Sequence, residues 1–173
     1  MFLSTRGLGG LSVQLCYYRG MSELRASNWL LDETALLRQM SSVRCAGGLT
    51  QIERLINHAL REHAKEPVKA LVFIGDAVEE NPDALCARAG QAGIRGLPLF
   101  MFQEGRDATV EKTFRSMAGL SGGAYAHFDH NSAAQLSELL GAVARYAAAG
   151  RSGLLEDGTG ASAGVKLLLQ QLK

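Results

Sequence analysis

The sequence predicts a doubly wound α/β domain, in which a mostly parallel sheet carries helices on both faces and one antiparallel strand at an edge. From Val68 onward, strand and helix patterns alternate with a repeat of roughly 30 residues, which is typical of successive βαβ units. The chain has 173 residues, 47% of them hydrophobic, so it is long and apolar enough to bury one substantial core. We therefore expect a single domain over residues 1–149 and a marginal tail over residues 150–173.

The amino-terminal part of the chain is expected to supply two strands and a helix. Residues 11–18 form an apolar run between glycines, and we place this run in the parallel sheet. Residues 21–30 are more polar and follow a tight turn, so we expect the antiparallel edge strand there. Asp32 then caps a helix over residues 32–44, in which apolar residues recur at helical spacing.

The strongest strand signal lies in the middle of the chain. A glycine-rich loop over residues 46–50 leads into an amphipathic helix over residues 51–63, with Thr50 as its expected N-cap. Residues 68–74 follow as a nearly continuous apolar run. Such a run predicts a central parallel strand that is covered by helices on both sides.

The remaining elements continue the alternation of strands and helices. We expect strands at 97–102 and 124–128, and helices at 83–92, 109–120 and 132–149. Residues 165–172 are expected to form one more short element that packs loosely.

Charge and composition exclude several classes of function. Eighteen basic and seventeen acidic side chains leave a net charge of +1, so the chain has no broad positive field for a nucleic acid or a membrane surface. Neither a secretory signal nor a run of about 18 apolar residues is found, which argues against export and a membrane span. Cys16, Cys45 and Cys86 lack C-x-x-C spacing. We interpret them as buried thiols in a reducing compartment and expect a cytoplasmic protein.

Two polar residues are the candidate metal ligands. Asp76 directly follows the predicted strand at 68–74, and Thr50 lies in the loop before the helix that leads into that strand. Ligands of open parallel sheets bind beyond the carboxyl ends of the strands, and a hydroxyl with a carboxylate suits Mg²⁺. The alternative is that Thr50 and Asp76 merely cap successive helices, with Glu79 and Glu80 as partners of a helix dipole.

Four segments together resemble the von Willebrand factor A family, in a form found inside bacterial cells. They are CAGGLTQIERLINHAL, VKALVFIGDAVEE, LPLFMFQEG and LSGGAYAHF, and the resemblance extends over residues 11–149. In that family, a divalent ion at the metal-ion-dependent adhesion site is held by an Asp-x-Ser-x-Ser loop, a threonine in a glycine-rich loop and an aspartate after the fourth strand. Thr50 and Asp76 match the second and third of these elements. The resemblance implies binding of protein partners, often beside AAA+ ATPases.

The first ligand element of that family has no counterpart in this chain. Neither an Asp-x-Ser-x-Ser loop nor a hydrophobic strand precedes Leu11, and residues 1–8 resemble the end of the family's first helix. We therefore expect a version of the domain that is shortened at its amino terminus. Weak or absent Mg²⁺ binding should follow, together with open strand edges that favour self-association.

Three functional hypotheses result. The leading one is a non-enzymatic interaction module, in which a partner carboxylate completes the coordination of an Mg²⁺ ion held in part by Thr50 and Asp76. The alternative is an enzyme of another doubly wound family, with Asp76 as nucleophile or Mg²⁺ ligand in phosphoryl transfer or hydrolysis. The third is an inert, truncated remnant. P-loop and G-x-G-x-x-G elements are missing, which argues against the NTPase and dinucleotide-binding classes.

Overall fold

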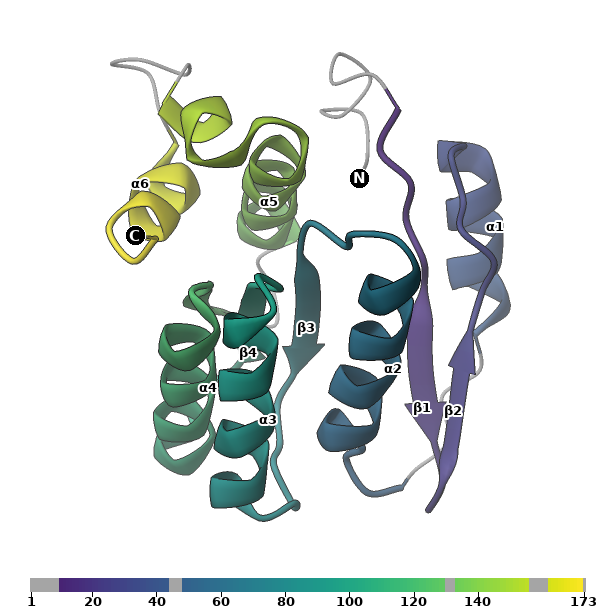
Figure 1. Ribbon diagram of the computed structural model, residues 1–173, viewed down its shortest axis with the longest axis vertical. Coiled ribbons are helices and arrows are strands. Elements are labelled where there is room, and N and C mark those ends of the chain that lie inside the picture. Colours follow the sequence, from purple (N-terminus) through teal and green to yellow (C-terminus); the bar gives the residue numbers. More distant parts are fainter. Residues whose placement is uncertain (1–9, 44–47, 130–132, 156–161, 173) are drawn as a thin grey trace.

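The computed structural model describes residues 10–43, 48–129, 133–155 and 162–172 (Figure 1). Its strands are β1 (Cys16–Arg19), β2 (Glu23–Ala26), β3 (Leu71–Gly75), β4 (Leu99–Glu104) and β5 (Ala124–Phe128). Its helices are α1 (Glu33–Ser42), α2 (Ile52–Lys65), α3 (Pro82–Ile94), α4 (Ala108–Ser121), α5 (Ala133–Leu155) and α6 (Ala163–Leu169). The predicted α/β class with a parallel sheet is confirmed.

The strands form two sheets rather than the single predicted one. β3, β4 and β5 are parallel, in the order β3-β4-β5, whereas β1 pairs antiparallel with β2 in a separate sheet. Two predicted placements are therefore wrong: the run at 68–74 supplies an edge strand, and the run at 11–18 lies outside the parallel sheet. β4 is the central strand instead, because its first five residues are buried and both of its sides are paired.

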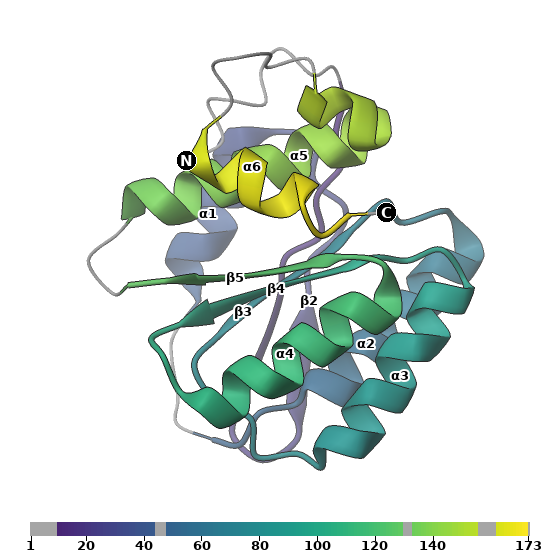
Figure 2. The same cartoon turned by 90° about the vertical axis from the view of Figure 1, so that its left-hand side faces the viewer.

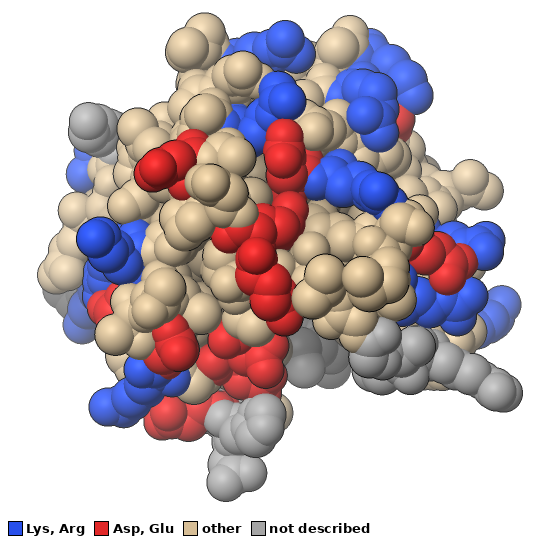
Figure 3. All heavy atoms as spheres, turned by 90° about the horizontal axis from the view of Figure 1, so that it is seen from below, with Lys and Arg blue, Asp and Glu red and all other residues tan. Residues whose placement is uncertain are grey.

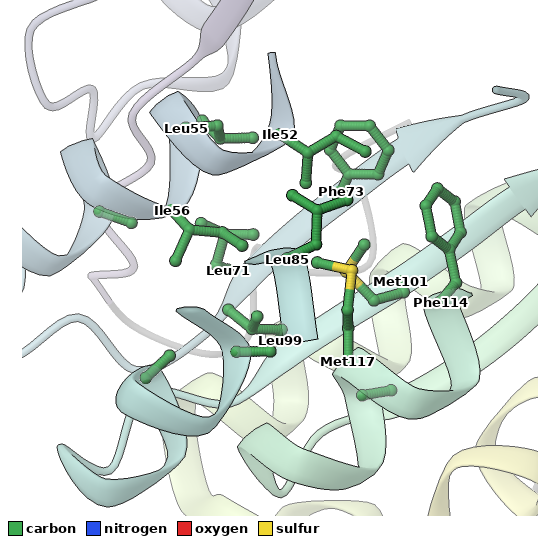
Figure 4. Packing of buried hydrophobic residues seen from close by; sticks show 14 of the residues in the cluster. Ile52, Leu55, Ile56, Leu71, Phe73, Leu85, Leu99, Met101, Phe114 and Met117 are labelled. Carbon is green, nitrogen blue, oxygen red and sulfur yellow. The ribbon is translucent and has the colours of Figure 1, made fainter. Parts of the chain in front are cut away.

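Helices cover both faces of the three-stranded sheet, as predicted (Figure 2). α2, α3 and α4 lie on one face, and α5 and α6 lie on the other. The core of the first face joins Ile52 of α2 to Phe73 of β3 and Phe114 of α4, and the two phenyl rings meet edge to face with centroids 5.4 Å apart (Figure 4). Cys16 and Tyr18 of β1 pack against the same cluster. The core beneath α2 therefore holds the two sheets together.

The carboxyl-terminal segment belongs to the core of the second face. We expected residues 165–172 to pack loosely, but Val165 and Leu168 have exposed fractions of 0% and Leu172 one of 4%. α5 is interrupted at Gly150, whose φ of 66° is incompatible with a continuous helix. The chain turns there, and α6 then packs against α5 and β5. The prediction of a loosely packed tail is wrong because these apolar side chains complete the cover of the sheet.

The Ser-Gly-Gly segment before β5 has a role in packing. Ser121 Oγ donates to the carbonyl of Ala118 and accepts the N–H of Leu99, at 3.0 and 3.1 Å. Gly122 ends α4 in the left-handed conformation, with a φ of 76°. A Cβ atom on Gly123 would lie 2.0 Å from the carbonyl oxygen of Leu99, so glycine is required where this turn crosses β4. Packing alone explains these three residues.

Two cysteines, Cys16 and Cys86, lie in the described part of the chain as half-buried free thiols rather than fully buried ones. Burial raises the pKa of both thiols, and it raises that of Cys16 to about 11 with a further contribution from the charge of Glu62. Both thiols are therefore protonated at neutral pH. The predictions for Cys45 and for residues 1–8 fall outside the described residues.

Candidate functional site

Acidic side chains gather at the end of the molecule where β3 finishes. Asp76, Glu79 and Glu80 follow β3, and we call these three residues the acidic edge. Figure 3 looks onto this end and shows a band of acidic side chains across it. The site is built from this edge, from the residues that lead into α2 and from the last residues of β1.

Thr50 is bound to the acidic edge by two hydrogen bonds. Its N–H donates to Glu79 Oε2 at 2.9 Å, and its Oγ1 accepts the N–H of Glu79 at 3.1 Å. These bonds from Thr50 lower the pKa of the Glu79 carboxyl, because they favour its charged form. Thr50 is thus held beside the segment that carries Asp76, although the two residues are far apart in sequence.

Glu80 closes the amino terminus of α2. Its carboxylate accepts the N–H groups of Ile52 and Glu53, at 2.5 and 2.9 Å. The N-cap residue itself, Gln51, makes no capping bond with its side chain. A carboxylate that precedes α3 in the sequence therefore satisfies the free donors of α2, where it also complements the positive end of the helix dipole.

Neither candidate ligand is a helix cap. We predicted Thr50 as the N-cap of the helix at 51–63, but Gln51 occupies that position and Glu80 supplies the capping carboxylate. Asp76 does not cap the following helix, because Asn81 accepts the first N–H groups of α3. The interpretation of both residues as helix caps is therefore wrong: Thr50 is bonded to Glu79, and the Asp76 carboxylate is exposed.

Gln51 ties the start of α2 to the end of β1. Its side chain is buried, with an exposed fraction of 5%, and its Nε2 donates to the carbonyl of Gly20 at 3.3 Å. Its Oε1 accepts from Arg54, which also donates to the carbonyl of Ser22 in the turn between β1 and β2. A Cβ on Gly48 would lie 2.2 Å from the oxygen of Gly20, so glycine permits this close approach. These contacts bring β1 next to the acidic edge.

The charges of the acidic edge affect the pKa of Tyr18 in β1. Burial raises the pKa of its phenol to about 12, and the charges of Glu80, Glu79 and Asp76 add to this effect. All three carboxylates favour the neutral phenol because they repel a phenolate. Tyr18 therefore reports on the charge of the edge.

The alkaline titration of Tyr18 should depend on these carboxylates. We expect Glu80→Gln to lower the pKa of Tyr18 more than Asp76→Asn does, with burial still holding it above 10. The raised pKa stabilises the fold fully below pH 10, and this contribution is lost as the pH rises through about 12. Carbon-13 NMR titration of the phenol carbon measures the shift, and Tyr125, whose pKa is raised by burial and Glu111, is the internal control. An unchanged Tyr18 titration in both variants would contradict this electrostatic description.

Thr50 and Asp76 lie at the same end of the sheet but do not form a complete metal centre. The Asp76 carboxylate is exposed, and Thr50 is engaged with Glu79. The described part of the chain contains no group of three or more His, Cys, Asp or Glu side chains placed to hold a metal ion. Mg²⁺ requires six oxygen ligands, some of them water. Among the described residues, the side chains at this end of the sheet therefore do not supply enough ligands for a resident ion.

Residues 160–164 have the G-x-S-x-G spacing of a hydrolase nucleophile, a match that our sequence analysis did not identify. Ser162 is the N-cap of α6, and its side chain accepts the N–H of Val165 at 3.4 Å. The nearest preceding element in the described residues is α5, which ends at Leu155, whereas a nucleophile elbow follows a strand. Among the described residues, this serine therefore has the surroundings of a helix cap.

Comparison with protein-family models, curated proteins and solved structures finds no match to this chain. Within the described ranges, no helix is both long enough and apolar enough to cross a lipid bilayer. A fold class alone does not identify a function.

Sequence reasoning missed two residues of this site. The sequence pattern predicts Glu80 as a partner of the following helix dipole, whereas its carboxylate binds the preceding helix. The pattern around Tyr18 predicts only an apolar strand. No local pattern indicates either role, because both depend on contacts between elements that are distant in sequence.

Proposed function

We propose that this chain is a non-enzymatic protein-interaction module of the von Willebrand factor A type, with the acidic edge as its docking surface. The observation that carries the proposal is the pair of hydrogen bonds between Thr50 and Glu79. They hold the threonine of a glycine-rich loop beside the aspartate that follows a parallel strand. This is the arrangement in which the resemblance assigns ligand roles to Thr50 and Asp76.

In this proposal, a carboxylate of the partner completes the coordination of Mg²⁺. Thr50 and Asp76 contribute two oxygens, and water and the partner supply the others. Affinity for the ion and affinity for the partner are then coupled, since each ligand strengthens binding of the other. The resemblance favours an AAA+ ATPase as the partner.

Metal binding with and without a carboxylate probe tests the proposal. Mn²⁺ is the metal probe, because it takes the same oxygen ligands as Mg²⁺ and broadens nearby NMR signals. We expect Mn²⁺ alone to broaden the amide signals of residues 50 and 76–80 only at concentrations on the order of millimolar. A capped Gly-Asp-Gly peptide should lower the concentration required, and excess Mg²⁺ should reverse the broadening.

Two matched variants locate the site. Asp76→Asn should abolish the effect of the peptide, whereas Asp129→Asn should leave it unchanged. Asp129 provides the control because its side chain is also exposed but follows β5, where it faces Arg106. Equal broadening of the amide signals by Mn²⁺ and the peptide in the unsubstituted protein and in Asp76→Asn would refute the assignment of Asp76 as a metal ligand. Hydrolysis of para-nitrophenyl phosphate that requires Mg²⁺ and Asp76 would support the enzymatic alternative instead.

A further inference from the structure

The outer edge of β5 is closed by the side-chain amides of two glutamines. Gln171 donates to the carbonyl of Tyr125 at 2.9 Å and accepts the N–H of Tyr125 at 3.0 Å, as a neighbouring strand would. Gln135 donates to the carbonyl of His127 at 3.1 Å. Unpaired strand edges readily recruit other chains, and proteins commonly block them. One side of the parallel sheet is therefore protected.

The outer edge of β3 has no such protection. The N–H of Leu71 donates to the carbonyl of Pro98 at 3.0 Å, so Leu71, Phe73 and Gly75 direct their main-chain groups towards β4. Val72 and Ile74 consequently direct theirs away from the sheet. Among the described residues, these outward groups have no hydrogen-bond partner. β3 thus presents the donors and acceptors of an incomplete ladder.

β1 presents a second edge, at which the main-chain groups of Cys16 and Tyr18 have no partner among the described residues, whereas Gly20, directly after β1, pairs with Gly48. The carbonyl of Leu15 accepts the N–H of Ser27 at 2.9 Å, which fixes the alternation along β1 and turns the main-chain groups of Cys16 and Tyr18 away from β2. The rings of Tyr18 and Phe73 are stacked, with centroids 6.5 Å apart and an interplanar angle of 9°. β1 and β3 run in the same direction in Figure 1. Their open edges therefore lie side by side over the core beneath α2, without pairing to each other.

The side chains around these edges define the chemistry of an occupant. Cys16–Tyr18 and Leu71–Gly75 contain no charged residue, and Ile74 leaves 44% of its side chain exposed. Asp76 follows β3 with an exposed carboxylate. An apolar extended segment suits the edges, and a basic residue just beyond its carboxyl end suits Asp76 when the segment runs parallel to β3.

We propose that the edges of β1 and β3 together bind one extended, apolar segment of a partner polypeptide, which joins the two sheets through main-chain hydrogen bonds. This is recognition by strand addition. A single segment is favoured over a second copy of this chain, because a copy would bring a whole sheet with helices on both faces to an edge already flanked by β1. The inference goes beyond the proposed function and concerns the metal-free protein, because Mg²⁺ and the basic residue of the segment compete for Asp76.

A synthetic peptide tests this proposal. The probe is a fluorescent, capped peptide of sequence Ser-Val-Ile-Val-Thr-Arg-Lys, measured by anisotropy in the presence of EDTA. We expect saturable binding, together with slowed hydrogen exchange at the amides of Val72 and Ile74. The same peptide with N-methyl groups on alternate residues should bind on the order of tenfold more weakly, because it keeps its side chains but loses main-chain donors.

Variants of the protein separate strand pairing from nonspecific adhesion. Ile74→Pro removes an outward N–H that β4 does not use, so binding should weaken on the order of tenfold while the circular dichroism spectrum is retained. Ile94→Lys removes an apolar side chain that is 89% exposed on α3, and it should leave binding unchanged. Equal binding of the N-methylated peptide, or no saturable binding at all, would overturn the proposal. Protection of Val72 and Ile74 by self-association without peptide would also overturn it, in favour of a second copy.

Discussion

Gly123→Ala is expected to destabilise the protein by about 4 kcal/mol or more, which places it in the tail of measured single-substitution effects. The added methyl group would lie 2.0 Å from the oxygen, 2.6 Å from the carbon and 2.8 Å from the nitrogen of Leu99. All three atoms belong to the main chain of the central strand, so no rotamer change relieves the clash. The turn or β4 must move, and β4 is buried between two paired neighbours.

The same substitution four residues earlier is the matched control. Gly119 lies in α4 with no atom within 4 Å of a built Cβ, so Gly119→Ala should stabilise the protein by about 0.5–1 kcal/mol through helix propensity. Urea unfolding of the two variants measures the free energy of unfolding directly. Extrapolation from urea leaves an uncertainty of about 1 kcal/mol in the free energy of unfolding. A free energy of unfolding for Gly123→Ala that lies within this range of the unsubstituted protein would contradict the close packing at Gly123.

Glu80→Ala is expected to destabilise the protein by about 2–4 kcal/mol, because two charge-assisted hydrogen bonds to the start of α2 are lost together. Ile52 has an exposed fraction of 1%, so water cannot readily replace the carboxylate at its N–H. Equilibrium urea unfolding gives the total effect. Hydrogen exchange of the first amides of α2 shows whether the loss begins at that helix terminus.

Glu79→Ala provides the comparison for Glu80→Ala. Glu79 is an exposed neighbour whose carboxylate accepts one bond, from Thr50, and its loss should cost no more than about 1 kcal/mol. Equal effects of the two substitutions would show that the general negative charge of the acidic edge matters, and that the capping geometry of Glu80 does not.

The sequence predicted the elements that depend on local periodicity. The apolar runs at 97–102 and 124–128 are β4 and β5, and the amphipathic pattern at 51–63 is α2, with Leu55 and Ile56 buried as the spacing requires. Asp32 is the N-cap of α1, as its position before the helical pattern predicts. Each of these features is determined by residues within one or two turns, so the sequence pattern is sufficient.

Features that depend on pairing between distant segments were not predictable in this way. The apolar run at 68–74 has the composition of a central strand, but composition does not say which strands lie beside it. The bonds from Glu80 to α2 and from Gln171 to β5 span 28 and 46 residues, respectively. A glutamate or a glutamine carries no local mark of such a role. Thr50 and Asp76 could be selected because they lie in loops, whereas Tyr18 could not.

The two hydrogen bonds from Gln171 to Tyr125 also determine when the outer edge of β5 becomes protected during biosynthesis. Gln171 follows Tyr125 by 46 residues, so a ribosome makes β5 well before it makes the side chain that closes its edge. A nascent chain with β3, β4 and β5 already paired therefore has both sides of its sheet open to other polypeptides. Translation of residues 163–172 and docking of this segment beside β5 end the exposure there. This segment thereby limits the period in which a nascent chain can aggregate through that strand edge.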